Sequence, residues 1–301
     1  MTQEVLNKQI KTTTDLRGIV NTMKMLSSVS VGQFEKALKS LNQYTRNVQS
    51  AFRGLFAQEN FQYEPPSRPH GKNKILTIII GSDNGLVGRF NRDLIDIMKH
   101  NLQNQSNCIK LITVGKRLAP MALTTDFPVI ANYNNSNTVK EISALATAIL
   151  TKINQVVSKE GFDKVLLFYT NRQNNESSVQ MEQLIPFQDN LLSNLKTKKW
   201  DGKTLPLITA EHNELFSALI REYLQIVLVH ALTASLASEH YIRMVHMQQA
   251  EKNIDERLNE LRLIYQQTRQ NQITDELIDI VSGAQAINKM KRTLDKVFKN
   301  A

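Results

Sequence analysis

IDERLNELRLIYQQTRQNQITDELIDIVSGAQAINKM, residues 254–290, is the stretch that decides the fold of this chain. Apolar or seam-type residues recur there, and just beyond, at alternating steps of three and four: Ile254, Leu258, Leu261, Tyr265, Thr268, then Leu277, Ile280, Ala284, Ile287, Met290 and Leu294. This heptad spacing is typical of one helix wrapped around another. Residues 207–301 contain no proline and one glycine, Gly283, so an unbroken helix would run roughly 140 Å. Such a helix needs a partner to bury its stripe.

The first 59 residues supply that partner. They contain no proline, and a second stripe steps by three and four through Leu16, Ile19, Met23, Leu26, Ser30, Phe34, Leu38, Leu41, Thr45, Val48, Phe52 and Leu55. We therefore predict that residues 1–59 and 207–301 pair as a long antiparallel coiled coil. Small residues on both helices, around Ser27 and around Ser235 and Ser238, are expected to face one another and to let the backbones approach closely.

The segment between the two helices, residues 60–206, changes character. Three prolines mark a linker at residues 60–73. Strand-like and helix-like stretches then alternate. The strand-like stretches are short apolar runs at residues 75–80, 109–114, 128–130, 164–169 and 179–187. The helix-like stretches are residues 89–103, a short helix that ends at 123, and residues 138–160, for which Asn137 is a plausible cap. This alternation predicts an inserted, Rossmann-like α/β domain with a mostly parallel sheet and an edge strand at 179–187. An irregular polar segment, residues 188–206, leads back to the long helix.

One stretch resembles a ligand site. Residues 81–88, GSDNGLVG, follow a strand and precede a helix, which is where α/β domains bind phosphates. Its glycines are spaced G-x-x-x-G-x-x-G, whereas the dinucleotide motif requires G-x-G-x-x-G and the Walker motif ends in Gly-Lys-Ser/Thr. We therefore favour a tight structural turn over a nucleotide site.

Other catalytic and metal-binding chemistry finds no support. The six histidines form no metal-ligand spacing. Asp83 has no titratable neighbour in sequence, and no nucleophile elbow is visible. We expect no catalytic residue, no cofactor and no metal. No aromatic and basic interleaving suggests nucleic-acid binding.

Composition bounds the compartment. A single cysteine, Cys108, favours a reducing compartment. No secretory signal is visible and no apolar run approaches the roughly 20 residues that span a bilayer. The net charge of +9 is spread along the chain except near the C-terminus, at Lys289, Lys291, Arg292, Lys296 and Lys299. Those cations either complement the helix dipole in solvent or form a docking surface for acidic protein.

Three stretches together resemble the gamma subunit of F-type ATP synthases, from one end of the chain to the other. They are Thr22-Met23-Lys24-Met25; Ser82 to Gly88 with Phe90-Asn91; and Ser238-Glu239-His240 with Arg243-Met244, Tyr265, Arg269-Gln270, Ile273-Thr274, Glu276-Leu277 and Ile280 to Ala284. Two segments depart from the usual pattern: Val87-Gly88-Arg89 replaces Cys-Gly-Gly, and residues 31–36 lack a basic pair. Both departures resemble the alternate N-type branch, in which sodium pumping is suspected.

The resemblance implies a non-catalytic central shaft that transmits torque. Its expected partners are three alpha and three beta subunits, the epsilon subunit and the membrane ring of c subunits, at the cytoplasmic face of a bacterial inner membrane. The family's coupling residues match Met23, Lys24, Arg243, Gln270, Ile273, Thr274, Asp279, Ile280 and Val281. Lys24 and Arg243, being charged, are expected to face the ring or to pair with acidic residues there. Ile273, Ile280 and Val281 are either coupling residues or coiled-coil core.

Two other interpretations stay open at this point. One is a gamma-like paralogue, or a coiled-coil adaptor, that serves a different assembly. The other is an α/β nucleotide-binding enzyme with helical arms, which would have to bind nucleotide as an isolated chain.

Overall fold

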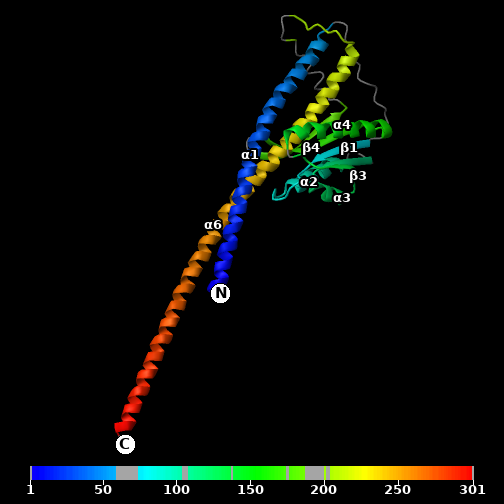
Figure 1. Ribbon diagram of the computed structural model, residues 1–301. Helices are drawn as coiled ribbons and strands as arrows, with labels where there is room; N and C mark the ends of the chain where they lie inside the picture. Colours follow the sequence, from blue (N-terminus) through cyan, green and yellow to red (C-terminus); the bar gives the residue numbers. More distant parts are fainter. Residues whose placement is uncertain are drawn as a thin grey trace. The chain divides into compact units, whose positions relative to one another are not determined.

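A computed structural model describes residues 2–58, 74–103, 108–136, 138–173, 176–186, 200 and 204–299, with the backbone alone at 139, 286 and 288–299. The helices and strands, in chain order, are α1 (Gln3–Phe56), β1 (Lys74–Ile80), α2 (Phe90–Leu102), β2 (Cys108–Val114), α3 (Leu118–Leu123), β3 (Val129–Tyr133), α4 (Val139–Glu160), β4 (Lys164–Gln173), β5 (Glu176–Ile185) and α6 (His212–Lys299). Figure 1 labels them along the chain. The linker at 60–73, Asn137, most of 188–206 and the C-terminal basic side chains lie outside the described residues.

The predicted fold class is confirmed: two long terminal helices enclose an inserted α/β sheet. The chain divides into two compact units. One comprises Met25–His246, and the other comprises Met1–Lys24 together with Met247–Ala301. α1 and α6 contribute to both units, and each unit is described by itself below.

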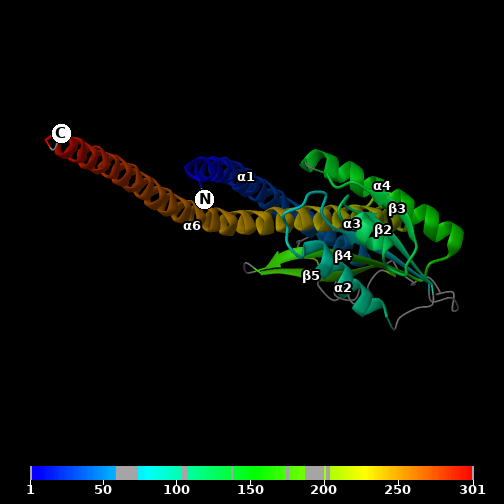
Figure 2. The same cartoon turned by 90° about the horizontal axis from the view of Figure 1, so that it is seen from below.

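The sheet of the larger unit has the order β3-β2-β1-β4-β5. The first four strands are parallel, and β5 joins β4 as an antiparallel edge strand, as predicted. Runs such as KILTIII in β1 form central strands because β-branched side chains suit a sheet covered on both faces. α2 and α3 cover the face that includes Ile75 and Ile79, while α4 and α6 cover the face that includes Leu76 and Ile78 (Figure 2).

The small residues of α6 meet the sheet. Ser235 Oγ donates to the carbonyl of Ile80 over 3.2 Å, and Ser238 Oγ donates to the carbonyl of Thr170 over 3.2 Å. Both serines are almost fully buried. The expectation that Ser235 and Ser238 face the serines of α1 was therefore wrong: their small size lets α6 approach the ends of strands β1 and β4.

Within the larger unit, α1 and α6 are also joined by an aromatic cluster. Phe52 is fully buried, with ring centroids 6.2 Å from Phe56, 6.0 Å from Phe216 and 6.5 Å from Tyr223. Nearby, Tyr44 Oη donates to Glu222 over 2.8 Å. The rising numbers on α1 meet falling numbers on α6, as an antiparallel pair requires.

The smaller unit is a short antiparallel coiled coil. Gln3 Nε2 donates to Tyr265 Oη over 3.0 Å, Arg17 pairs with Asp255 at 2.6 Å, and Lys24 pairs with Glu251. On α6 the predicted stripe holds in this unit, since Leu258 and Leu261 are buried and Ile254, Tyr265 and Thr268 are partly buried.

The stripe predicted for the first half of α1 was wrong in register. Leu16, Ile19 and Leu26 are 49, 57 and 64 % exposed. The buried or partly buried positions include a series spaced by threes, fours or sevens: Leu6, Ile10, Thr13, Val20, Lys24, Ser27, Val31 and Phe34. Met23 and Ser30 of the predicted stripe are partly buried as well. This seam carries threonine, lysine and serine, so an apolar-residue count selected the neighbouring stripe, which faces solvent in the isolated chain.

α6 extends far past the start of α1. Gln3 contacts Tyr265, and the 34 residues from Gln266 to Lys299 continue as helix for about 50 Å. From Arg269 to Gln285, every side chain is exposed. The predicted seam positions Leu277, Ile280, Ala284 and Ile287 therefore have no covering helix among the described residues of the chain.

α6 also contains a stretch long and apolar enough to cross a membrane by length and composition, which the sequence analysis did not anticipate. Several apolar residues of this helix, among them Leu228, Leu232 and Leu236, are buried against the sheet. Their packing accounts for the apolar character of the stretch as part of a protein core.

Candidate functional site: the joint between α6 and the sheet

The strand order of the sheet reverses between β1 and β4, because β2 and β3 lie on one side of β1, whereas β4 and β5 lie on its other side. The carboxyl ends of β1 and β4 mark this point. In open α/β sheets, ligands usually bind in the crevice at this point. Here α6 fills it, because Ser235 and Ser238 donate to the last carbonyl of β1 and to a carbonyl of β4. The usual ligand crevice of this fold is therefore occupied by the chain's own helix.

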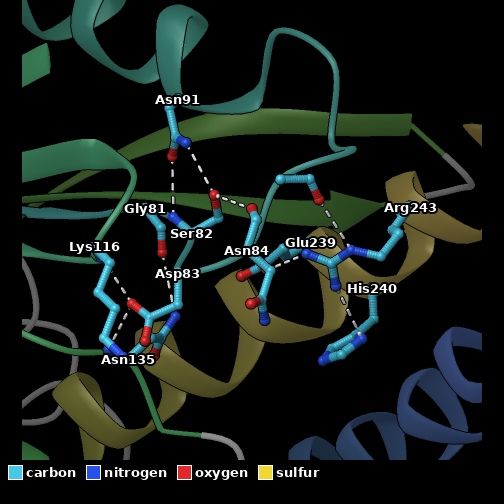
Figure 3. A network of polar contacts seen from close by, with 11 residues as sticks. Gly81, Ser82, Asp83, Asn84, Asn91, Lys116, Asn135, Glu239, His240 and Arg243 are labelled. Carbon is cyan, nitrogen blue, oxygen red and sulfur yellow. Dashed lines mark hydrogen bonds and ion pairs between the residues drawn. The ribbon is translucent and has the colours of Figure 1, made fainter. Parts of the chain in front are cut away.

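The glycine-containing loop between β1 and α2, residues 81–89, is held by its own side chains (Figure 3). The Ser82 amide donates to Asn91 Oδ1 over 3.0 Å, and Asn91 Nδ2 donates to Ser82 Oγ over 2.9 Å. Asp83 Oδ1 accepts the backbone amides of Lys116 and Asn135 over 2.8 and 2.9 Å. Asp83 thus bridges the loops that follow three adjacent strands, a structural use of the carboxylate.

Gly88 of this loop has a φ of +58°, in the left-handed region that favours glycine. A Cβ at this position would lie 2.6 Å from His246 Nε2 on α6. The exposed side chain of His246 would have to move to admit this Cβ, and the left-handed φ is the stronger reason for glycine here. This arrangement supports the structural interpretation of the glycine spacing over the nucleotide-site interpretation.

A buried ion pair on α6 fastens the loop. Arg243 and Glu239 are 4 and 2 % exposed, and their Nη2 and Oε1 atoms lie 2.5 Å apart. Arg243 Nε also donates to the carbonyl of Gly85 over 3.2 Å, and the backbone of Asn84 hydrogen-bonds the Glu239 carboxylate. Figure 3 shows Glu239 and Arg243 projecting from α6 toward the loop, whereas the ring of His240 lies on the side of α1. The expectation that Arg243 faces outward was wrong in this structure, because its charge is used inside the chain.

The pKa values of two neighbouring groups in this network, Glu239 and His240, are shifted in opposite directions. Burial, partly offset by Arg243, raises the pKa of the Glu239 carboxyl to about 7. Burial, with the positive charge of Arg243, lowers the pKa of His240 to about 4. His240 also stacks on Phe34 of α1, with ring centroids 5.5 Å apart. The folded state therefore disfavours both an ionised Glu239 and a protonated His240.

These shifts predict opposing effects on stability in acid. Between pH 7 and 4.5 the folded chain holds a proton on Glu239 that the unfolded chain lacks, so a fall in pH stabilises the folded state through this group. Between pH 6.5 and 4 His240 is protonated in the unfolded chain but not in the folded chain, so a fall in pH destabilises the folded state through this group. Glu239→Gln should make the unfolding free energy fall more steeply from pH 7 to pH 5, and His240→Gln should make it fall less or rise, each by about 2 kcal/mol. Urea unfolding at both pH values measures these slopes. Identical slopes in both variants and the unmodified chain would contradict the assignment.

The residues predicted for coupling are scattered rather than gathered. Met23 is partly buried on α1, and Lys24 pairs with Glu251 rather than standing free. The others beyond Arg243 are all exposed on the extension of α6: Gln270, Ile273, Thr274, Asp279, Ile280 and Val281. The alternative that Ile273, Ile280 and Val281 form core within this chain is not supported, since they are 48, 68 and 54 % exposed.

Sequence reasoning missed several residues of the joint. Glu239 could have been found from its four-residue spacing to Arg243, which places both on one helix face. Asn91 stood out only through the family resemblance, and its partners are the amide and the hydroxyl of Ser82. Asn135 carries no such signal, because its side chain donates to the carbonyl of Gly81, which the sheet brings near. Among the residues that the structure describes, no three metal-ligating side chains converge.

Comparison with known proteins decides the family. A sequence profile of the family described as ATP synthase matches residues 2–287. The gamma chain of a Clostridium perfringens ATP synthase is 28 % identical over 282 residues, 93 % of this chain and 96 % of the relative. The chain belongs to the ATP synthase gamma chain family. The gamma chain of Christiangramia forsetii is 29 % identical, covering 94 % of this chain and 98 % of the relative.

Solved structures share the fold of this gamma family member. A chain from the OSCP/F1/c-ring portion of Euglena gracilis mitochondrial ATP synthase matches with a TM-score of 0.66 at 18 % identity, covering 96 % of both chains. A chain from the central stalk and c-ring of Tetrahymena thermophila mitochondrial ATP synthase matches with a TM-score of 0.54 at 20 % identity, covering 77 % of this chain and 99 % of that one. The joint and the coiled coil thus lie on a fold that these structures share over most of their length.

Proposed function

We propose that this chain is the central rotating shaft of an F-type ATP synthase or ATPase. It transmits torque between a membrane ring of c subunits and a catalytic ring of three alpha and three beta subunits, with an epsilon subunit beside its α/β domain. The chain itself is not an enzyme, since ATP is made or hydrolysed on the beta subunits. It sits peripherally at the cytoplasmic face of the bacterial inner membrane.

The observation that carries this proposal is the exposed extension of α6. Large apolar side chains there are about half exposed or more: Ile273, Leu277, Ile278, Ile280, Val281 and Ile287. A soluble protein rarely leaves so many apolar residues together in water unless they contact a partner. A sleeve of subunits around the helix would cover all of its faces, whereas a single docked helix would cover one.

A second exposed surface supports the same partner. Leu16, Ile19, Leu26 and Val29 are all about half exposed or more on α1. Uncharged, apolar contacts suit a bearing, because they lack the ion pairs that would hold one rotational position. The shaft then acts by contacting three catalytic sites differently, so that their nucleotide affinities differ.

The rival interpretations make different predictions. A nucleotide-binding enzyme is disfavoured because α6 fills the crevice where this class of domain binds ligands. A gamma-like paralogue or adaptor would not co-purify as a single copy with three alpha and three beta subunits. The division into 1–59, 60–206 and 207–301 as structural domains remains a prediction.

The finer assignment to the N-type branch, with sodium as a candidate coupling ion, is also proposed. It rests on Val87-Gly88-Arg89 and on the absence of a basic pair in residues 31–36. The ion ligands of such an enzyme would lie on the c subunits, so a test of ATP-driven ²²Na⁺ uptake by vesicles containing the complex addresses it. Uptake abolished by proton-conducting uncouplers would contradict a primary sodium pump.

The function is tested by substitution on the extension. Ile273→Ser with Ile280→Ser should leave the unfolding free energy of the chain within about 0.5 kcal/mol, because both side chains are already exposed. In the assembled complex, ATP-driven ion uptake should fall at least about threefold, which corresponds to the loss of about 0.7 kcal/mol of contact energy. Gln272→Ser, on the same helix but polar, is the matched control.

Charge reversal at the predicted coupling residue Lys24 gives a second measurement. Lys24→Glu should retain most ATP hydrolysis while ion uptake falls, since it breaks the pair with Glu251 in the shaft and not the catalytic sites. Unchanged uptake in both the Lys24 and the Ile273/Ile280 variants would reject the rotor function.

A further inference from the structure

We propose that Arg172 fastens α1, α6 and the β4–β5 hairpin to one another, so that the shaft and its α/β domain turn as one body under load. This inference rests on the proposed rotor function. It assigns to Arg172 a positioning role that is separate from the apolar core and from contacts with any other subunit.

The side chain of Arg172 touches two helices at once. It lies next to the last residue of β4, and its guanidinium pairs with Glu35 of α1. The guanidinium carbon also lies 4.1 Å from the centre of the Tyr241 ring on α6. A planar guanidinium can donate to a carboxylate in its plane while stacking its face on an aromatic ring, and lysine cannot do both.

Neighbouring contacts place the three elements at the same level. Phe34, next to Glu35, stacks on His240, next to Tyr241. Ser238 binds the carbonyl of Thr170, two residues before Arg172 on β4. Arg172 therefore sits where α1, α6 and the hairpin already converge, and it adds a polar contact to both helices.

The value of this contact is geometric more than energetic. The side chains of Arg172 and Glu35 are 23 and 40 % exposed, and an ion pair of that exposure adds little to stability. Transmission of torque depends on how firmly the elements are held in place relative to one another, and not on the net stability of the chain. Among the described residues, α6 is held to the sheet by two buried serines that donate to strand carbonyls, whereas α1 is bonded to β4 through the pair of Glu35 and Arg172. A lateral bond from β4 to α1 resists sliding of α1 along α6, which apolar packing resists less well because it has no fixed direction.

The consequence appears only under load. Without an opposing ion gradient, a shaft that twists elastically still completes its rotation. Against a large gradient, the same twist is lost work, so that net pumping stalls at a lower gradient.

The test uses charge reversal and rescue in the assembled complex in membrane vesicles. Arg172→Glu and Glu35→Arg each place like charges together, and the double variant restores an ion pair with reversed polarity. Lys110→Glu and Glu160→Lys form a matched control, because that pair has side chains of similar exposure, 26 and 38 %, and lies between β2 and α4 away from the shaft. A potential-sensitive anionic dye reports the maximum membrane potential that ATP hydrolysis sustains, whichever cation is moved.

Each single reversal at Arg172 or Glu35 should lower that maximum potential about twofold, with unloaded ATP hydrolysis within about 1.5-fold of the unmodified complex. The double variant should recover most of the loss, although not the stacking on Tyr241. Control reversals should leave the potential unchanged. Equal potentials in all variants, or a double variant as impaired as the singles, would overturn the role of Arg172. Failure of the unmodified complex to build any potential would instead reject the rotor function.

Discussion

Arg243→Ala is expected to lower the free energy of unfolding of the chain by about 3–5 kcal/mol at pH 8, one of the two largest effects among the single substitutions considered. The substitution leaves Glu239, which is 2 % exposed, without its cation, and it frees the carbonyl of Gly85. The β1–α2 loop should lose its attachment to α6. Urea unfolding of the full chain, followed by circular dichroism, measures the change.

The pH dependence of this cost identifies its origin. Burial raises the pKa of the Glu239 carboxyl to about 7 even beside Arg243, and removal of that cation raises it further, so the carboxyl of the variant sheds its charge as the pH falls. The cost of Arg243→Ala should therefore be smaller at pH 5.5 than at pH 8. Arg257→Ala, in the exposed pair with Glu260 on the same helix, should cost less than about 1 kcal/mol at either pH. A loss for Arg243→Ala that is the same at both pH values would show that packing, and not the buried charge, is responsible.

Phe52→Ala is expected to cost about 3–5 kcal/mol, because it opens a cavity where three other aromatic rings meet. The side chain is fully buried and joins the end of α1 to the start of α6. Differential scanning calorimetry of the chain should show a lower unfolding temperature. Phe52→Leu should recover roughly half of the loss, as a smaller apolar side chain refills part of the space.

Tyr44→Phe serves as the comparison for Phe52. It removes the hydroxyl that binds Glu222 at an exposed position of the same two helices and should cost less than about 1 kcal/mol. A cost for Phe52→Ala as small as that of Tyr44→Phe would mean that the cluster does not hold the helices together.

The sequence predicted the architecture because the strongest periodicities agree with it. Runs such as residues 75–80 and 164–169 are too short and too β-branched for helices, and the structure has strands there. The long helices followed from the absence of proline and the spacing of residues such as Leu258 and Leu261. The edge position of β5 followed from Pro186, since a proline cannot donate to a neighbouring strand.

The register of α1 could not be predicted in the same way. Its seam contains Thr13, Lys24 and Ser27, while the neighbouring stripe contains Leu16, Ile19 and Leu26. Apolar residues normally mark the buried face, and here they mark the face that this chain leaves open. In a subunit that is covered by others, an apolar stripe can pack within its own chain or against a neighbouring subunit, and periodicity does not distinguish these two cases.

The joint was only partly predictable. The glycine spacing correctly indicated a tight turn, and residues 238–243 stood out through family resemblance. The contacts that Ser235, Ser238, Arg172 and Asn135 make across the joint depend on carbonyls and carboxylates that lie 52 residues or more away in the chain. Only the completed sheet and coil bring these groups together.

The extension of α6 beyond Gln266 has a consequence for biogenesis. Exposed apolar side chains attract other unfolded or partly folded chains, and a free copy of this subunit would present several of them between Ile273 and Ile287. We expect cells to keep free copies scarce and to close the surrounding subunits around the helix soon after synthesis. Expression of the chain without those subunits should then give aggregates that Ile273→Ser with Ile280→Ser partly relieves, so that solubility and coupling depend on the same residues.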